Sequence, residues 1–438
     1  MMSRSRRIVA AAALLGSALH AQSIAGTWQG AVTAGGSSFR QVLMFAKGDT
    51  GWKAVYYSLD EAGDSVLATS AVLDGRKLKL SVPPHFSESS SSFEATFSPD
   101  GRSLTGTWID SDGRYPLTMR RVTAKEAWTL PPSHTIRLVQ VDTNVRLEVL
   151  DWGGSGRPLV FMSGLGGTAH GFDSYAPKFT PKYHVYGITR RGFGASSSPP
   201  FTRANYRADR LGDDVLAVLD SLGLHRPVLV GHSIAGEELS SIGSRYPAKV
   251  AGLIYLDAGY GYALYDRSRG DFILDRGVLV QQLRQLEPGR LPPADLRTLV
   301  HTMRDSTLPR FEKDIAEYAK NLDAMPAPAD SPAPDTTPNA GRAILDGIEK
   351  YTSIPVPILA IYAVPHRPLP MPGTDSATRV RMQARFDSVT AAYATSFENG
   401  VPTAHVVRIP NATHFVFQSN EAEVLREMTA FLATLPQP

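Results

Sequence analysis

The chain has 438 residues, of which 42% are apolar and 20% charged, the composition of a globular protein large enough for two or three domains. Its formal charge is +3, which becomes 3 − 3 = 0 when Arg4, Arg6 and Arg7 at the N-terminus are set aside. A neutral chain gives no support for nucleic-acid binding. The sequence has no cysteine, which excludes disulfides, a thiol nucleophile and thiolate metal sites.

Residues 1–21 have the features of a secretory signal peptide. Arginines precede an apolar run over 8–19, and Ala21 offers a cleavage point, with Ala18 as the other option. The apolar run is too short to span a bilayer, and no later segment is apolar enough to do so. We therefore expect a secreted or periplasmic protein without a membrane span.

Residues 22–122 predict a small antiparallel β domain. A Gly-Thr-Trp segment at 26–28 recurs at 106–108, and short segments of alternating polarity lie between them. These segments are 39–45, 52–58, 65–73, 77–82, 92–97 and 115–121. The pattern is typical of a meander that is closed or nearly closed, and the paired segments resemble lipocalin-like small barrels. Such a domain offers a substrate pocket or docking surface, or is a structural module without chemistry. Residues 123–134 predict a linker.

Residues 135–257 predict the first part of an α/β domain. After a hairpin over 136–151, a buried strand at 158–162 ends in Ser-Gly-Leu-Gly-Gly at 163–167. This loop would present backbone N–H groups at the carboxyl edge of a sheet, where open α/β sheets bind ligands. The next strand leads into Thr-Arg-Arg-Gly-Phe-Gly-Ala-Ser at 189–196, and a helix is predicted over 207–222.

A serine at the apex of a strand–turn–helix is the strongest signal in the chain. The apolar run at 227–230 leads into Gly-His-Ser-Ile-Ala at 231–235, and a helical pattern follows. The residues two before and two after the serine are Gly231 and Ala235, as a tight turn between closely packed strand and helix requires. This arrangement is a nucleophile elbow, with Ser233 as the candidate nucleophile.

The order of these motifs resembles the α/β-hydrolase superfamily over residues 135–435. The resemblance implies an α/β-hydrolase fold, a mostly parallel sheet with helices on both faces and a helical cap insertion. It also implies an oxyanion hole made by the backbone N–H groups of Leu165 and Ile234, a small-molecule acyl substrate, and no metal or organic cofactor. Ser163 stands where the superfamily usually has histidine, a change that bears on the rigidity of the loop more than on chemistry.

Residues 258–350 predict the cap, with helical patterns over 278–286, 294–303 and 311–322. Such a cap excludes water and selects substrate. Tyr260, Tyr262 and Tyr265 either line the pocket or pack between cap and core. His301 and Asp305 have helical spacing, and we interpret them as a solvated face, because one histidine and one aspartate do not make a metal site.

Residues 351–438 complete the core with strands at 356–364 and 406–409 and a final helix over 420–432. His414 lies between the last strand and that helix, where the resemblance places the general base.

The acid of the triad has two candidates. Asp257 ends the strand at 250–256, and Asp375 follows the strand at 356–364 by eleven residues. That strand is followed directly by Pro-His-Arg-Pro, without a carboxylate, and Asp387 falls inside a predicted helix. We prefer Asp257, because the acid must be held rigidly at a strand end.

The sequence therefore predicts a hydrolase that cleaves a carboxylic ester, or a related amide or lactone, through Ser233, His414 and Asp257. One alternative is a peptidase of the proline-iminopeptidase type. The carboxylates that would hold its substrate's amine are Asp266, Asp271 and Asp275. Others are a cofactor-free haloperoxidase or perhydrolase and a catalytically silent binding protein. No motif bears on the oligomeric state.

Overall fold

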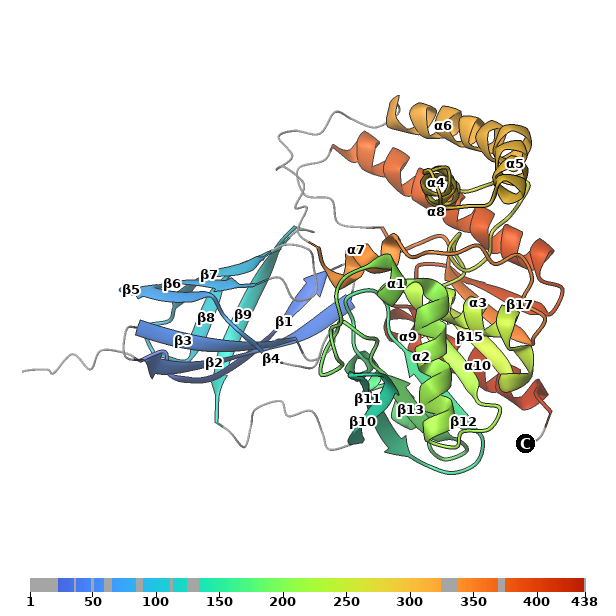
Figure 1. The fold of residues 1–438 in the computed structure, drawn as a ribbon. Coiled ribbons are helices and arrows are strands. Elements are labelled where there is room, and N and C mark those ends of the chain that lie inside the picture. Colours follow the sequence, from blue (N-terminus) through green and yellow to red (C-terminus); the bar gives the residue numbers. More distant parts are fainter. Residues whose placement is uncertain are drawn as a thin grey trace, which may run out of the picture.

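The computed structural model describes most of the chain. Its strands form two sheets (Figure 1). The described residues are 23–34, 37–48, 51–58, 65–83, 90–110, 113–123, 134–323, 338–368 and 375–436. The predicted signal peptide, residues 1–21, and residues 124–133 of the predicted linker lie outside these ranges. Within them, no helix combines the length and apolar content that crossing a bilayer requires.

The first sheet is antiparallel and curls into a half-barrel, drawn in blue to cyan in Figure 1. Its strands are β1 (Gly26–Ala34), β2 (Ser37–Gly48), β3 (Gly51–Ser58), β4 (Ser65–Leu67), β5 (Ser70–Asp74), β6 (Lys77–Val82), β7 (Ser91–Phe97), β8 (Ser103–Ile109) and β9 (Arg114–Val122). They pair in the order β4-β3-β2-β1-β9-β8-β7-β6-β5.

The prediction of one continuous strand over 65–73 is wrong, because the chain crosses there from one edge of the sheet to the other. The N–H of Ala68 donates to the Ala54 carbonyl of β3, and the N–H of Thr69 donates to the Ser81 carbonyl of β6, both at 2.9 Å. This short link joins the edge strands β4 and β5. It brings the two ends of the sheet together.

The two tryptophans of the Gly-Thr-Trp segments form the core of the β domain. Trp28 is fully buried and Trp108 is 4% exposed. The Trp28 indole N–H donates to the Ile24 carbonyl at 2.9 Å, and Tyr56 stacks on Trp108 with ring centroids 4.9 Å apart. Buried tryptophans remove a large apolar area from water, provided that the indole N–H finds an acceptor.

The second sheet confirms the predicted α/β-hydrolase fold. Its strands are β10 (Thr135–Asp142), β11 (Val145–Gly153), β12 (Pro158–Met162), β13 (His184–Ile188), β14 (Val228–His232), β15 (Gly252–Leu256), β16 (Ile358–Ala363) and β17 (Ala404–Ile409). The order is β10-β11-β13-β12-β14-β15-β16-β17. The pairs β10–β11 and β11–β13 are antiparallel, and all later pairs are parallel. The residues of β14, β15 and β16 are all buried, as parallel strands covered on both faces require.

Helices cover both faces of this sheet. Those near it are α1 (Arg203–Tyr206), α2 (Ala208–Ser221), α3 (Gly236–Arg245), α8 (Ser376–Gly400), α9 (Val416–Ser419) and α10 (Glu421–Thr434). One apolar cluster takes in Leu219 of α2 and Leu239 of α3, and a second, on the other face, takes in Val424 and Met428 of α10. The amphipathic faces of these helices hold the strand ends in place.

A helical segment lies between β15 and β16. It contains α4 (Phe272–Gln285), α5 (Pro293–Thr302), a π turn (Met303–Thr307), α6 (Leu308–Asp323) and α7 (Ala340–Leu345). Figure 1 shows α4, α5 and α6 at the top of the molecule, beside the long helix α8. The rings of Phe272 in α4 and Tyr318 in α6 stack 4.3 Å apart.

The two domains touch at one end of the first hairpin. Val32 of β1 pairs with Phe39 of β2, and their side chains are 4% and 6% exposed. The ring of Phe39 packs edge-on against Phe415 of the α/β domain, with centroids 5.4 Å apart. In Figure 1 the ends of β1 and β2 point toward the α/β domain. The β domain therefore reaches the residue next to His414.

Candidate active site

The candidate residues gather at the carboxyl edge of the second sheet. Ser233 follows β14, Asp257 follows β15, and His414 lies in the loop after β17. The register pairs His232 with Leu256 and Leu256 with Ile361. Because neighbouring parallel strands end at the same level, the residues that follow them emerge side by side.

Ser233 occupies a strained turn. Its φ is +54°, in the left-handed region that costs a residue with a Cβ about 1 kcal/mol or more. A Cβ on Gly231 would lie 2.9 Å from Leu239 Cδ1 and 3.1 Å from the Ala235 Cβ. The small residues on either side of the serine are thus needed for strand and helix to pack, as the sequence analysis predicted.

Asp257 is fully buried and accepts hydrogen bonds from several sides. Its Oδ1 accepts from the Ala363 N–H at 3.0 Å and its Oδ2 from the Tyr260 hydroxyl at 2.9 Å. Its Oδ2 also lies 2.7 Å from Nδ1 of His414. Burial opposes the charged form, but the neighbouring His366 and His414 hold the pKa of Asp257 below its usual range.

His414 is held against the elbow by its own backbone. Nε2 of His232 donates to the His414 carbonyl at 3.0 Å, and the two rings lie 4.7 Å apart. Burial lowers the pKa of His232 to about 3, so this imidazole is neutral at pH 7. The His414 side chain is 41% exposed and so is accessible to a small molecule. Since His232 directly precedes Ser233, the hydrogen bond from His232 places the candidate base near the candidate nucleophile.

Asp375, the alternative acid, lies elsewhere. Its side chain accepts from the Thr378 N–H at 2.9 Å and caps the N-terminus of α8. It is exposed, whereas Asp257 is buried against His414. The geometry brings His414 together with Asp257.

The glycine-rich loop after β12 approaches the serine closely. A Cβ on Gly164 would lie 3.0 Å from both the Ser233 Cβ and Nδ1 of His232, so any larger residue there would press on the elbow. Ser163 Oγ donates to the Gly167 carbonyl across the loop at 2.8 Å. The serine that departs from the superfamily pattern therefore ties the loop together. Leu165 follows Gly164 directly, and Ile234 follows Ser233, so the two residues predicted to form the oxyanion hole are the chain neighbours of this close contact.

Arg190 joins this loop to the helix of the elbow. Its guanidinium donates to the carbonyls of Ser163 at 3.0 Å and Gly164 at 3.3 Å. It also forms a two-point ion pair with Glu238 of α3. Both side chains are buried. The neighbouring Arg191 likewise binds Asp214 at two points, each 2.6 Å. Both arginines of the Arg-Arg segment therefore have a structural role.

Glu237 is a buried acid that the sequence analysis did not single out. It is fully buried, and among the described residues neither of its carboxylate oxygens has a hydrogen-bond partner. Burial, with Glu238 beside it, raises the pKa of Glu237 well above its usual value. This side chain lies one helical turn after Ser233, and its burial favours the uncharged form.

The tyrosines of the segment after β15 divide between two tasks. Tyr260 binds the acid Asp257, and Tyr262 interacts with the Ser233 side chain. Tyr265 instead donates to Asp275 at 2.9 Å, away from the triad candidates.

The three carboxylates considered for an amine substrate already have partners. Asp266 accepts from Ser268 and Ser396, each at 2.7 Å. Asp271 caps α4 and accepts from Tyr393 at 3.1 Å. Asp275 is bound by Lys350. His301 and Asp305 are exposed, in keeping with a solvated face.

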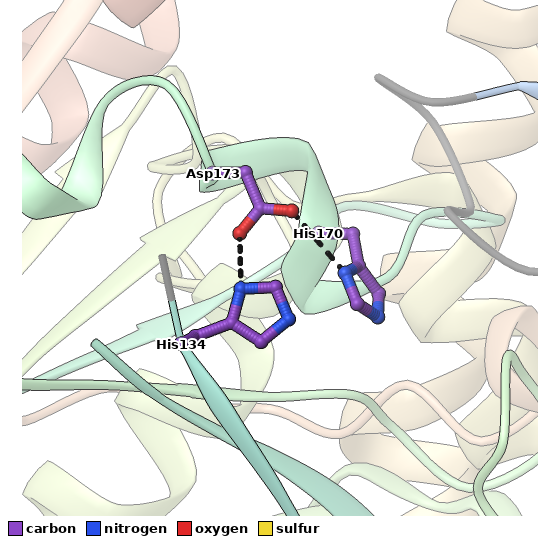
Figure 2. Close-up of side chains that lie close together, drawn as sticks. All are labelled: His134, His170 and Asp173. Carbon is purple, nitrogen blue, oxygen red and sulfur yellow. Dashed lines mark hydrogen bonds and ion pairs between the residues drawn. The ribbon is translucent and has the colours of Figure 1, made fainter. Parts of the chain in front are cut away.

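A second cluster, of His134, His170 and Asp173, has the residue types of a metal site. Figure 2 shows that both histidines point at Asp173, with His134 Nδ1 2.8 Å and His170 Nδ1 3.2 Å from its two oxygens. His170 Nε2 faces the other way, 3.3 Å from Glu148.

The nitrogens of His170 therefore serve two carboxylates, and an ion at either one would displace a partner. Burial opposes protonation, but Asp173 and Glu148 raise the pKa of His170 to about 9. We interpret the cluster as an ion-pair network that braces the segment after the glycine-rich loop.

Comparison with known proteins identifies the family of the chain. Residues 159–427, more than half of the chain, match the model of the alpha/beta hydrolase family. The chain is 39% identical over 101 residues to epoxide hydrolase A of Mycobacterium tuberculosis, covering 21% of this chain and 29% of that protein. It is 30% identical over 138 residues to 3-oxoadipate enol-lactonase 2 of Acinetobacter baylyi, covering 31% and 51%.

The match thus spans about half the length of these relatives or less. Among solved structures, an epoxide hydrolase of Bacillus megaterium in complex with an inhibitor has a TM-score of 0.42 and 17% identity, covering 68% of this chain and 100% of that one. The match to the family model extends from β12 to α10, and the chain therefore belongs to the alpha/beta hydrolase family.

Proposed function

We propose that this chain is a serine hydrolase that cleaves a carboxylic ester and acts in the periplasm or outside the cell. The observation that carries the proposal is the 2.7 Å contact between His414 Nδ1 and the buried Asp257, beside a strained elbow that carries Ser233. A serine becomes a useful nucleophile when a base stands next to it and a third group orients that base.

In the proposed reaction, His414 Nε2 takes the proton of Ser233 as Oγ attacks the ester carbonyl. Asp257 holds the Nδ1–H and stabilises the imidazolium that forms. The N–H groups of Leu165 and Ile234 donate hydrogen bonds to the developing oxyanion, each contributing on the order of 10²–10³ in rate. His414 then protonates the leaving alcohol, which leaves an acyl ester on Ser233. A water that His414 deprotonates attacks this ester, and His414 returns the proton to Ser233 Oγ as the carboxylic acid is released.

Bond chemistry favours an acyl substrate over an epoxide, although one relative is an epoxide hydrolase. Attack of Ser233 on an epoxide carbon would join enzyme and substrate by an ether, which water does not cleave readily. Attack on an ester or a lactone gives an acyl ester, which water does cleave. A lactone is the second candidate, because another relative is an enol-lactonase.

A fluorophosphonate probe tests the nucleophile directly. We expect stoichiometric labelling at neutral pH, complete loss of labelling in Ser233→Ala, and no change in Ser388→Ala, an exposed serine of α8. A panel of p-nitrophenyl esters, lactones and aminoacyl amides, and an assay with peroxide and halide, then separates esterase from lactonase, peptidase and haloperoxidase. A Ser233 that resists the probe would favour the silent binding protein.

The proposed location has its own test. When the chain is expressed with its N-terminus intact, N-terminal sequencing of the exported protein should find cleavage after Ala21 or Ala18. Retention of the uncleaved chain in the cytoplasm would contradict the location without bearing on the chemistry.

A further inference from the structure

Asp257 has a second histidine beside it that the proposed reaction does not use. Nε2 of His366 lies 3.5 Å from Asp257 Oδ2, the same oxygen that faces His414. On its other side, Nδ1 of His366 lies 3.4 Å from Asp387 Oδ1. The His366 side chain is only 2% exposed. Asp257 therefore stands between two imidazoles, and one of them stands between two carboxylates.

The ring of His366 is held from its own backbone and from α8. The backbone N–H of His366 donates to Asp387 Oδ1 at 2.8 Å, and its backbone carbonyl accepts from Gln383 at 3.3 Å. Gln383 also donates to both oxygens of Asp387 at 3.1 Å. The ring of Phe386 packs on the imidazole with centroids 4.3 Å apart. Residues 383–387 of α8 thus contact both the backbone and the ring of His366 and fix its position.

His366 lies at the same edge of the sheet as the candidate catalytic residues. It lies three residues after the end of β16, at the carboxyl edge that also holds Ser233 and Asp257. The sequence has no carboxylate at this strand end, and a histidine that contacts the acid stands there instead.

A buried carboxylate needs a compensating charge before the reaction begins. The proposed reaction needs a neutral His414 to accept the serine proton, and a neutral imidazole brings no full charge to Asp257. Tyr260 offers a neutral hydrogen bond. The ring nitrogens of His366 make no hydrogen bond among the described residues, but they lie within ion-pair distance of Asp257, at 3.5 Å, and of Asp387, at 3.4 Å, so this imidazole can bring positive charge beside Asp257.

We propose that His366, oriented by Asp387, is a positioning residue that keeps Asp257 ionised and directed at His414. This role rests on the proposed function, in which Asp257 is the acid of the triad. Among the described residues, the ionisable groups that interact with Asp257 are His232, Tyr260, Tyr262, Tyr362, His366 and His414, and the carboxylates within ion-pair distance of His366 are Asp257 and Asp387. Without His366, Asp257 would accept a proton more readily, and His414 would lose its orientation as the pH falls.

The test is the pH dependence of fluorophosphonate labelling between pH 5 and 9. His366→Phe keeps an aromatic ring against Phe386 and removes both ring nitrogens. We expect it to lower the labelling rate about 10- to 100-fold at pH 6, and less at pH 8.5, so that the acid side of the profile moves up by ~0.5–1 pH unit. His366→Gln, which can still donate one hydrogen bond, should recover part of the rate. Asp387→Asn should shift the profile in the same direction by a smaller amount.

His405→Gln is the matched control, because this histidine is exposed on β17. A His366→Phe protein that melts like the parent and keeps its labelling profile would overturn the proposal. So would a loss of rate that is equal at every pH and follows the loss of thermal stability, since that is the sign of a purely structural residue.

A substrate-free readout separates this proposal from the proposed function. The proton between His414 Nδ1 and Asp257 should give a low-field ¹H NMR signal, assigned by its loss in His414→Ala. His366→Phe should move or broaden that signal, and an unchanged signal would contradict the role of His366. Failure of the parent protein to label Ser233 would overturn the proposed function and leave this measurement valid.

Discussion

The two domains bury different kinds of side chain. The described part of the β domain buries three polar residues, Gln29, Gln41 and Ser58, and no charged one. The α/β domain buries many ionisable side chains, among them Glu148, His170, Arg190, Glu238, Asp257 and His366. Charges are costly to desolvate, so their concentration in one domain marks where the chemistry and the pH sensitivity reside. The predictions below test that contrast.

The largest effect should come from the acid of the triad. Asp257→Asn removes the charge that stabilises the His414 imidazolium and turns an amide toward Nδ1, so we expect a fall of about 10³–10⁴ in the rate of ester hydrolysis. Asp375→Asn, the matched control, should stay within about threefold of the parent. Steady-state kinetics on a p-nitrophenyl ester measures both, and a larger loss in the Asp375 variant would reverse the assignment.

The next effect concerns stability. Arg190→Met leaves Glu238 buried without its partner and next to Glu237, so it should lower the free energy of unfolding of the α/β domain by about 3–5 kcal/mol. Lys79→Met in the β domain breaks the exposed Lys79–Glu94 pair, at 3.3 Å, and should cost less than about 1 kcal/mol. Urea unfolding of the full chain compares them, and equal losses would refute the contrast between the domains.

The pH dependence of stability should also belong to the α/β domain. The folded-state pKa of His170 is raised from 6.5 to about 9. The stabilisation is therefore fully present below pH 6.5 and is lost as the pH rises through about 9. We expect the free energy of unfolding to fall by on the order of 2–3 kcal/mol over this range.

Urea unfolding at a series of pH values measures this loss. His170→Gln should be less stable at pH 6 and should lack most of the dependence. A parent protein whose stability is flat between pH 6.5 and 9 would mean that His170 is neutral in the folded state.

The smallest effect should lie where the two domains meet. Phe39→Ala removes the edge contact with Phe415, which is worth about 0.5–1.5 kcal/mol beyond the area it buries. Because Phe415 follows His414, we expect the labelling rate of Ser233 to change by about two- to fivefold. Met44→Ala, at an exposed position of the same strand, is the control. A change in Phe39→Ala as large as that in Asp257→Asn would mean that the β domain takes part directly in the reaction.

Sequence reasoning was most successful where the signal is local. The elbow is read from five consecutive residues, and the structure shows the positive φ of Ser233 and the tight approach at Gly231 that those residues imply. The helix expected around Asp387 is α8. The split at 65–73 was missed because alternation of polarity continues through the crossing from one sheet edge to the other.

The sequence did not reveal which buried charges pair with one another. Arg190 and Glu238 lie 48 positions apart, and no periodic pattern links them. His366 did leave a signal, a histidine directly after a buried strand. Its meaning depends on Asp387, which approaches it only because α8 packs across the end of β16.

The sequence alone predicted the family and pointed to Ser233 and His414 as candidate nucleophile and base, because strand–turn–helix spacing and motif order are properties of neighbouring residues. Only the tertiary structure decided which carboxylate meets His414. Asp257 lies 157 positions away along the chain, and it reaches the imidazole because β15 is placed between β14 and β16 and ends level with both. The order of strands in a sheet is set by the packing of the whole domain, and a linear pattern of residues does not contain it.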